Sequence, residues 1–303
     1  MKAAKIIVFI VFFIFLIVWF FMVSQKKMEE FYYAQASMSL QRVAIVIPIK
    51  QEGLTIETES EAAISTRINS LGKEKILFQK EIYKGLPIAS LTKLMTAIIA
   101  LENYSEQKYN LDSLVNISEK AANQSNVSAS GNLVVNEKLS IKELLDLVLI
   151  YSSNDSAFAL SEVMGEDFFI QKMNEKALEI GLINTHFINS TGLDPKDKNI
   201  IPNYSTVKDL VVVTKYILEK HPIIFETTLK KGDYMPYNGL SSLFFSDNQQ
   251  LIGGKTGYTL DAGGCLLIVF KNNQDHTFIN IILGSLSPEK RIEEMQKLIN
   301  WNI

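Results

Sequence analysis

A serine and a lysine three residues apart begin a long apolar stretch of this sequence. The stretch runs from Pro87 to Asn103 and reads PIASLTKLMTAIIALEN, with Ser90 and Lys93 near its start. Residues three apart share one face of a helix, and Pro87 disfavours helix before it, so Ser90 should lie at or near a helix start. A lysine buried there has a lowered pKa, because desolvation and the helix dipole both disfavour its charge. A neutral amine can act as the base for a serine nucleophile, so the pattern predicts that Ser90 is the nucleophile and Lys93 its base.

The serine–lysine pair is not specific by itself. Ser-x-x-Lys occurs by chance about once in 250 positions. The lysine could also lay its stem along the core and extend its charge to solvent. The interpretation therefore depends on whether other chemical groups accompany the pair.

A second candidate element is Ser152–Asn154, which reads Ser-Ser-Asn. It lies between two helical patterns, Ile141–Tyr151 and Asp155–Met164, so a short loop would present the hydroxyl of Ser152 and the amide of Asn154. Ser130–Asn132 also has the form Ser-x-Asn, but no helical pattern flanks it. We favour the first site, because a helix-flanked loop fixes geometry better, although serine and asparagine are also common as turn and cap residues.

A third candidate element is Gly253–Thr259, which reads GGKTGYT. Lys255 supplies a cation and Thr256 a hydroxyl, and Gly257 lacks the side chain that would block a substrate. The alternative is a basic, glycine-containing hairpin. Lys-Thr-Gly is expected by chance only about once in several thousand positions.

These three motifs, in this order, resemble those of the penicillin-recognising serine enzymes. The closer resemblance is to the serine-type D-alanyl-D-alanine carboxypeptidases, the low-molecular-mass penicillin-binding proteins, over about Ala62 to Trp301. The segments that carry it are PIASLTKLMTA, LLDLVLIYSSNDSAFAL, MNEKALEIGLINTHFINSTGLD, YSTVKDL, GGKTGYTLDAGGCL and RIEEMQKLINW. Two departures stand out: Ser153 occupies a position where the family most often has glycine, and no β-rich second domain or C-terminal anchor follows Trp301.

The resemblance implies a reaction on the end of a cell-wall stem peptide. Ser90 would attack the carbonyl between two D-alanines, with Lys93 as the base, and Ser152 would relay a proton to the leaving nitrogen. The backbone amides of Ser90 and Tyr258 would form the oxyanion hole. β-Lactams would act as covalent inhibitors, and no metal or organic cofactor would be needed.

The same resemblance implies how the substrate is held. Asn154 would bind the substrate amide, Lys255 and Thr256 would bind the terminal carboxylate, and Arg291 would assist them. Lys255 would also help to keep Lys93 neutral, since two like charges close together disfavour each other.

The predicted fold is α+β, with the antiparallel sheet of β-lactamases and transpeptidases. Ala62–Ile68 and Lys75–Lys80 have strand character around a turn-prone segment, and Gly264–Lys271 and Thr277–Gly284 read as later strands. Helical patterns fill the interval, and a last helix should begin at Pro288 with the preceding serine as its N-cap. We therefore expect one sheet built from both ends of the chain, packed with helices.

The N-terminus predicts a membrane anchor. Ile6–Val23 has no charge and is nearly long enough to span a bilayer. The predicted organisation is an anchor over residues 1–24, a tether over residues 25–60 and a catalytic domain over residues 61–303, on the extracytoplasmic side of the cell membrane. A cleaved signal peptide, with Ala34–Ala36 as the cleavage site, would instead give a secreted protein.

Composition narrows the alternatives. A net charge of -3 argues against nucleic-acid binding, and one cysteine and three scattered histidines argue against a zinc enzyme. A Ser-His-Asp hydrolase lacks a Gly-x-Ser-x-Gly motif here. A class A β-lactamase would need Glu-x-x-Leu-Asn, but Ile183 stands where the asparagine would follow Glu179 and Leu182. A D,D-endopeptidase and a non-catalytic peptidoglycan-binding scaffold remain open alternatives.

Overall fold

The computed structural model describes residues 56–106, 109–124, 131–230 and 240–301. All of them belong to one unit of the chain, residues 50–303. The predicted anchor and nearly all of the tether lie outside the described residues, so the anchor and the domain boundaries stay predictions. Within the described ranges, no helix combines the length and the apolar character needed to cross a membrane.

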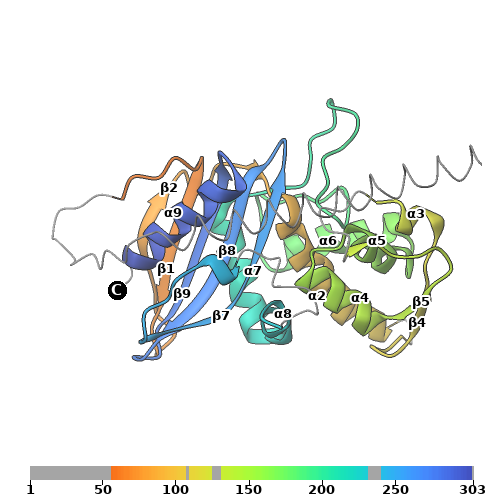
Figure 1. Cartoon of the computed structure of the whole chain (residues 1–303), viewed down its shortest axis with the longest axis horizontal. Helices are drawn as coiled ribbons and strands as arrows, with labels where there is room; N and C mark the ends of the chain where they lie inside the picture. The colour runs from red at the N-terminus through yellow and green to blue at the C-terminus, as the bar shows by residue number, and fades with distance from the viewer. Residues whose placement is uncertain (1–55, 107–108, 125–130, 231–239, 302–303) are drawn as a thin grey trace, which may run out of the picture. The chain divides into compact units, whose positions relative to one another are not determined.

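A five-stranded antiparallel sheet unites the two ends of this unit (Figure 1). Its strands are β1 (Ala62–Ile68), β2 (Glu74–Lys80), β7 (Gln249–Thr259), β8 (Gly263–Asn272) and β9 (Thr277–Ser285). The order is β2-β1-β9-β8-β7, so an early strand pairs directly with the last one. The prediction of an α+β fold with a sheet from both chain ends is confirmed.

Helices and short strands fill the interval between β2 and β7. They are β3 (Leu86–Pro87), η1 (Ala89–Leu91), α2 (Thr92–Glu106), β4 (Leu114–Asn116), α3 (Glu119–Ala122), β5 (Lys138–Ser140), α4 (Ile141–Ile150), α5 (Asn154–Glu162), α6 (Glu166–Glu179), β6 (Tyr204–Ser205), α7 (Val207–Lys220), α8 (Ile223–Thr228) and η3 (Leu240–Ser242), and α9 (Pro288–Trp301) follows the sheet. The N-terminus of α4 has a complete capping box, in which Ser140 and Glu143 bond each other's backbone amides.

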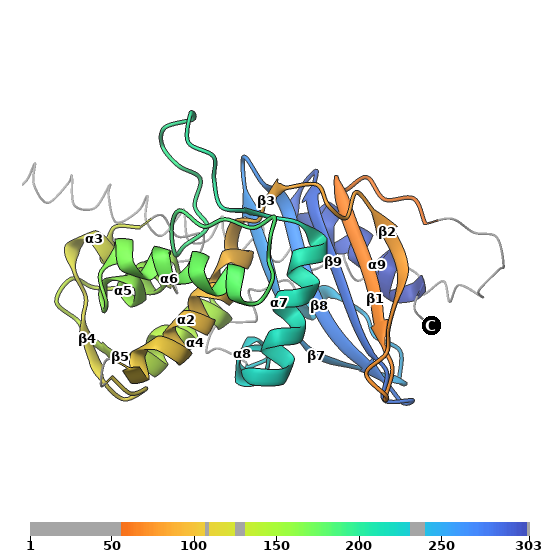
Figure 2. The same ribbon diagram turned by 180° about the vertical axis from the view of Figure 1, so that it is seen from behind.

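The sheet is covered on both faces. Figure 1 shows α9 in front of the sheet, and Figure 2 shows α7 in front of the opposite face. Alternate strand residues point to opposite faces, so one set packs on the helical body and the other on α9. The α9 side forms a core of its own that includes Phe270, Phe278 and Ile282 from the sheet and Met295 and Leu298 from the helix.

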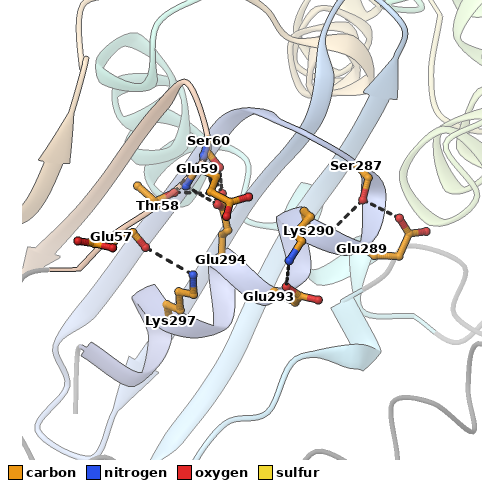
Figure 3. Close-up of polar contacts among 10 residues, drawn as sticks. All are labelled: Glu57, Thr58, Glu59, Ser60, Ser287, Glu289, Lys290, Glu293, Glu294 and Lys297. Carbon is orange, nitrogen blue, oxygen red and sulfur yellow. Dashed lines mark hydrogen bonds and ion pairs between the residues drawn. The ribbon is translucent and has the colours of Figure 1, made fainter.

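A buried carboxylate joins the segment before β1 to α9 (Figure 3). Glu294 accepts hydrogen bonds from the hydroxyls of Thr58 and Ser60 and from the backbone amides of Glu59 and Ser60. An ionised carboxylate accepts such donors well, and its removal would leave them without a partner in a buried place. This contact therefore fixes the start of β1 against the last helix.

Candidate active site

The serine and the lysine of the first motif meet at the start of α2. Ser90 lies in η1, a short 3-10 helix of one turn, and Lys93 lies in the first turn of α2. Lys93 has 0% of its surface exposed, and its Nζ is 3.0 Å from Ser90 Oγ. The side chain therefore does not extend to solvent but ends beside the hydroxyl.

Two carbonyl oxygens hold the amine of Lys93. Its Nζ is 2.6 Å from Oδ1 of Asn154 and 2.5 Å from the backbone oxygen of Thr191. A carbonyl oxygen can only accept, so these contacts use two N–H bonds. A neutral amine has two N–H bonds and one lone pair. Its lone pair is then left for the hydroxyl hydrogen of Ser90, which is the orientation that a general base needs.

Burial makes the neutral form of Lys93 accessible. Desolvation holds the pKa of Lys93 well below the ordinary lysine value, and the nearby charge of Lys255 lowers this pKa further. A lowered pKa of Lys93 is what the apolar sequence around this residue predicted.

The second motif forms the loop between α4 and α5. Ser152 has a left-handed backbone with φ of +58°, and its Oγ accepts a hydrogen bond of 2.8 Å from Lys255 Nζ. Ser153 points away from the amines: its Oγ caps α5 by accepting from the amide of Ser156 and donates to the carbonyl of Gly131. The alternative Ser-x-Asn site, residues 130–132, begins outside the described residues.

The third motif lies inside strand β7, at the open edge of the sheet. Lys255 is 1% exposed, and its Nζ contacts Ser152 Oγ and the carbonyl of Thr256. Burial lowers the pKa of Lys255 to about 7, and the charge of Arg291 acts in the same direction. Two hydroxyl–lysine pairs, Ser90–Lys93 and Ser152–Lys255, therefore lie together, with both amines depressed in pKa.

Gly257 lets β7 approach the backbone of Ser90. A Cβ at this position would lie 3.0 Å from the amide nitrogen of Ser90 and 3.1 Å from the carbonyl of Ile88. Tyr258 follows on the strand and is 41% exposed, whereas Thr256 is buried. The backbone of this strand segment is thus brought close to the amide of Ser90.

Arg291 reaches the site through the backbone of the third motif. It lies in the first turn of α9, and its Nη1 donates a 2.6 Å hydrogen bond to the carbonyl of Gly257. Burial lowers the pKa of this guanidinium. The structure therefore places Arg291 beside β7.

Reasoning from sequence missed the contribution of Thr191. Its carbonyl contacts Lys93, although no side chain in its segment indicates catalysis. The signal available was Gly192, which has φ of +81° and leaves no room for a Cβ, since that atom would lie 2.0 Å from the carbonyl of Ala89. A glycine required by both φ and close approach marks a loop that packs against the motif.

Other reactive side chains lie elsewhere. His221 bonds to Glu102 at the far end of α2. Burial raises the pKa of Cys265 to about 12, which leaves its thiol inert. In the part of the chain that the structure describes, no three His, Cys, Asp or Glu side chains are grouped to hold a metal ion.

The fold and this geometry define a class of protein: an α+β protein in which a serine hydroxyl is paired with a buried lysine amine. The family follows from comparison with known sequences, because residues 50–287 match the model of the peptidase S11 family, D-alanyl-D-alanine carboxypeptidase. The chain belongs to this family, as the resemblance of its motifs predicted.

Individual relatives agree with this assignment. The chain is 30% identical over 264 residues to D-alanyl-D-alanine carboxypeptidase DacF of Bacillus subtilis, covering 83% of this chain but 65% of the relative, slightly under two thirds of its length. It is 28% identical over 258 residues to D-alanyl-D-alanine carboxypeptidase DacC of Escherichia coli, of which it spans 62%. Among solved structures, penicillin-binding protein D2 of Listeria monocytogenes in its ampicillin-bound form is 28% identical, with a TM-score of 0.68 over 82% of this chain and 99% of that one.

Proposed function

We propose that this protein is a serine D-alanyl-D-alanine carboxypeptidase that removes the terminal D-alanine from peptidoglycan stem peptides. The observation that carries the proposal is the contact of a fully buried lysine amine with Ser90, completed by two carbonyl acceptors. Membership of the peptidase S11 family supports the same activity.

Acylation begins with the hydroxyl of Ser90. Its oxygen attacks the carbonyl carbon between the two D-alanines while its proton moves to the neutral amine of Lys93. The negative charge on the carbonyl oxygen is stabilised by the backbone amides of Ser90 and Tyr258. Gly257 supports this role, because its lack of a side chain lets the strand that carries Tyr258 approach the Ser90 amide. Collapse of this intermediate breaks the peptide bond and leaves an ester on Ser90. Ser152 relays to the departing nitrogen the proton that Lys93 took, so Lys93 becomes neutral again.

Substrate binding uses the other groups of the site. The side-chain amide of Asn154 binds the substrate's peptide group, and Lys255, Thr256 and Arg291 bind the terminal carboxylate. A substrate carboxylate beside Lys255 raises its pKa again and keeps it protonated. Water then hydrolyses the ester: Lys93 takes a proton from the water and returns it to the oxygen of Ser90 as the acid product leaves.

A second candidate activity is D,D-endopeptidase cleavage of crosslinked stem peptides. A D-alanyl-D-alanine endopeptidase of Escherichia coli is 28% identical to this chain over 253 residues, and the chain covers 77% of it. The two activities share the same chemistry and differ in the group that leaves.

We further propose that residues 6–23 anchor the protein in the cell membrane with the catalytic unit outside the cytoplasm, where the substrate lies. The uncharged apolar run supports this location. Carbonate extraction of membranes should leave the full chain in the pellet; release of the intact full chain into the soluble fraction contradicts the anchor.

Two measurements test the activity. A fluorescent penicillin should label the wild type and fail to label Ser90→Ala; equal behaviour of the two would instead favour a non-catalytic scaffold. Mass spectrometry of digested muropeptides then separates the candidates, because loss of one alanine indicates the carboxypeptidase and cleavage of crosslinks indicates the endopeptidase. Fast, sustained hydrolysis of nitrocefin would point to a β-lactamase instead.

A further inference from the structure

The loop that holds the Lys93 amine is shaped by a side chain of its own. The loop lies in the connection between α6 and β6, green to teal in Figure 2, part of which projects from the helical body. Oδ1 of Asn189 accepts from the amides of Thr191 at 3.1 Å and Gly192 at 2.7 Å, which closes the loop. Because Gly192 packs on the carbonyl of Ala89, the loop backbone rests directly on the residue before the nucleophile.

Asn203 links this loop to the catalytic helix. Its side chain is 2% exposed, and Oδ1 accepts from the amides of Ile188 at 2.7 Å and Asn189 at 3.2 Å. Its Nδ2 donates at 3.0 Å both to the carbonyl of Asn189 and to Oγ1 of Thr92. Its backbone carbonyl accepts from the amide of Ile88. One residue therefore bonds the loop, the neighbour of Lys93 and the segment that leads into Ser90.

We propose that Asn203 is a positioning residue for the general base, acting through the carbonyl of Thr191. This inference rests on the proposed function. The carbonyl orients the amine only while the distance between loop and helix is fixed. Asn203 bonds both, and it does so beside a second link, in which the hydroxyl of Thr96 on α2 donates to the loop carbonyl of Ser190 at 2.7 Å. When Asn203 is removed, the carbonyl of Thr191 shifts, the lone pair of the amine turns from the Ser90 hydroxyl, and the proton transfer slows.

The first test is Asn203→Ala, with Asn174→Ala as the matched control. Asn174 bonds the same connection in the same manner, through the amide and carbonyl of Phe187, but it does so from α6 and away from the amine. Each variant loses an asparagine whose side chain bonds backbone amides and carbonyls of the α6–β6 connection. We expect Asn203→Ala to slow acylation by a fluorescent penicillin by about tenfold to a hundredfold, the effect of a displacement near 1 Å, and Asn174→Ala to leave it within about twofold.

A second variant, Thr92→Val, keeps the volume of the side chain and removes only the hydroxyl that Asn203 bonds. It disturbs the core less than an alanine at position 203 and keeps the proposal testable if that variant folds poorly. We expect acylation to slow by about three- to tenfold, since the loop stays closed but loses one of its bonds to α2.

The distribution of the loss separates positioning from instability. In both test variants the rate constant of the chemical step should fall, while the dissociation constant of the initial penicillin complex should stay unchanged. Acylation by folded Asn203→Ala and Thr92→Val at the control rate would overturn the inference, as would a loss confined to initial binding. Failure of the proposed function is a different result, because the wild type itself would then remain unlabelled, like Ser90→Ala.

Discussion

Replacing Lys255 by methionine should stabilise the protein, and the gain should shrink as the pH rises. Lys255 is buried, and its pKa falls from 10.5 to about 7. Below about pH 7 the folded state holds a charged, desolvated amine, which costs free energy. Methionine fills a similar volume without that cost, so Lys255→Met should raise the free energy of unfolding by about 1–4 kcal/mol at about pH 6.

The sign of the pH dependence follows from proton counts. Between about pH 7 and 10.5 the folded state has released the Lys255 proton while the unfolded chain still binds it. The unfolded state binds more protons there, so the stability of the wild type rises with pH at up to about 1.4 kcal/mol per unit. The variant lacks this contribution, and its advantage should fall by about 2 kcal/mol from about pH 7 to about pH 9.

Urea unfolding of both proteins across this pH range measures the difference directly. Lys271→Met provides the control, because Lys271 lies on the neighbouring strand β8, is substantially exposed and pairs with Asp275. The control's difference from the wild type should not follow the same curve. A difference between the wild type and Lys255→Met that stays flat from about pH 7 to 9 would refute the depressed pKa.

Three further substitutions test buried contacts of the fold, two of them next to the candidate active site. Glu294→Gln should lower the free energy of unfolding by about 2–4 kcal/mol, because the NH2 group of glutamine would face backbone and hydroxyl donors. The acylation rate should stay unchanged. Equal stability of the two proteins in urea would show that the buried contact contributes nothing. Gly192→Ala should lower the free energy of unfolding by at least about 3 kcal/mol, because the new Cβ would meet the carbonyl of Ala89. The control Gly72→Ala has the same positive φ but open space around it, and should lower the free energy of unfolding by about 1 kcal/mol. Equal losses would contradict the close packing of Gly192 on Ala89. Gly257→Ala should slow acylation by about a hundredfold by displacing β7 from the Ser90 amide, and a rate within twofold of wild type would contradict that role.

The sheet and most helices were predictable because their patterns are local. Alternating or continuous apolar runs with clear turn residues predicted β1, β2, β8 and β9, and the capping box of Ser140 and Glu143 marked the start of α4. The strand β7 was harder to predict. Gly253, Gly254 and Gly257 lower its strand propensity, yet their small size is required because a Cβ at each would meet neighbouring backbone or side-chain atoms.

The site was predictable only as far as side-chain chemistry indicated it. The sequence predicted the pair of Ser90 and Lys93 and selected Ser152 and Lys255 as separate candidates; the structure adds the contact between the last two. Thr191 acts through a backbone carbonyl, which every residue has, so nothing in its side chain distinguishes it. Arg291 could be selected by family resemblance, but its contact with the Gly257 carbonyl depends on how α9 packs on the sheet.

The most direct test of the proposed chemistry is the acylation rate of Lys93→Met. The substitution removes the amine that contacts Ser90 and leaves an apolar side chain in an apolar place, so unfolding in urea should show equal or greater stability than the wild type. With the fold intact, labelling by a fluorescent penicillin should fall by about a thousandfold or more, because no other group is placed to take the Ser90 proton in the described part of the site. Acylation of the folded variant at a rate near that of the wild type would show that Lys93 is not the base.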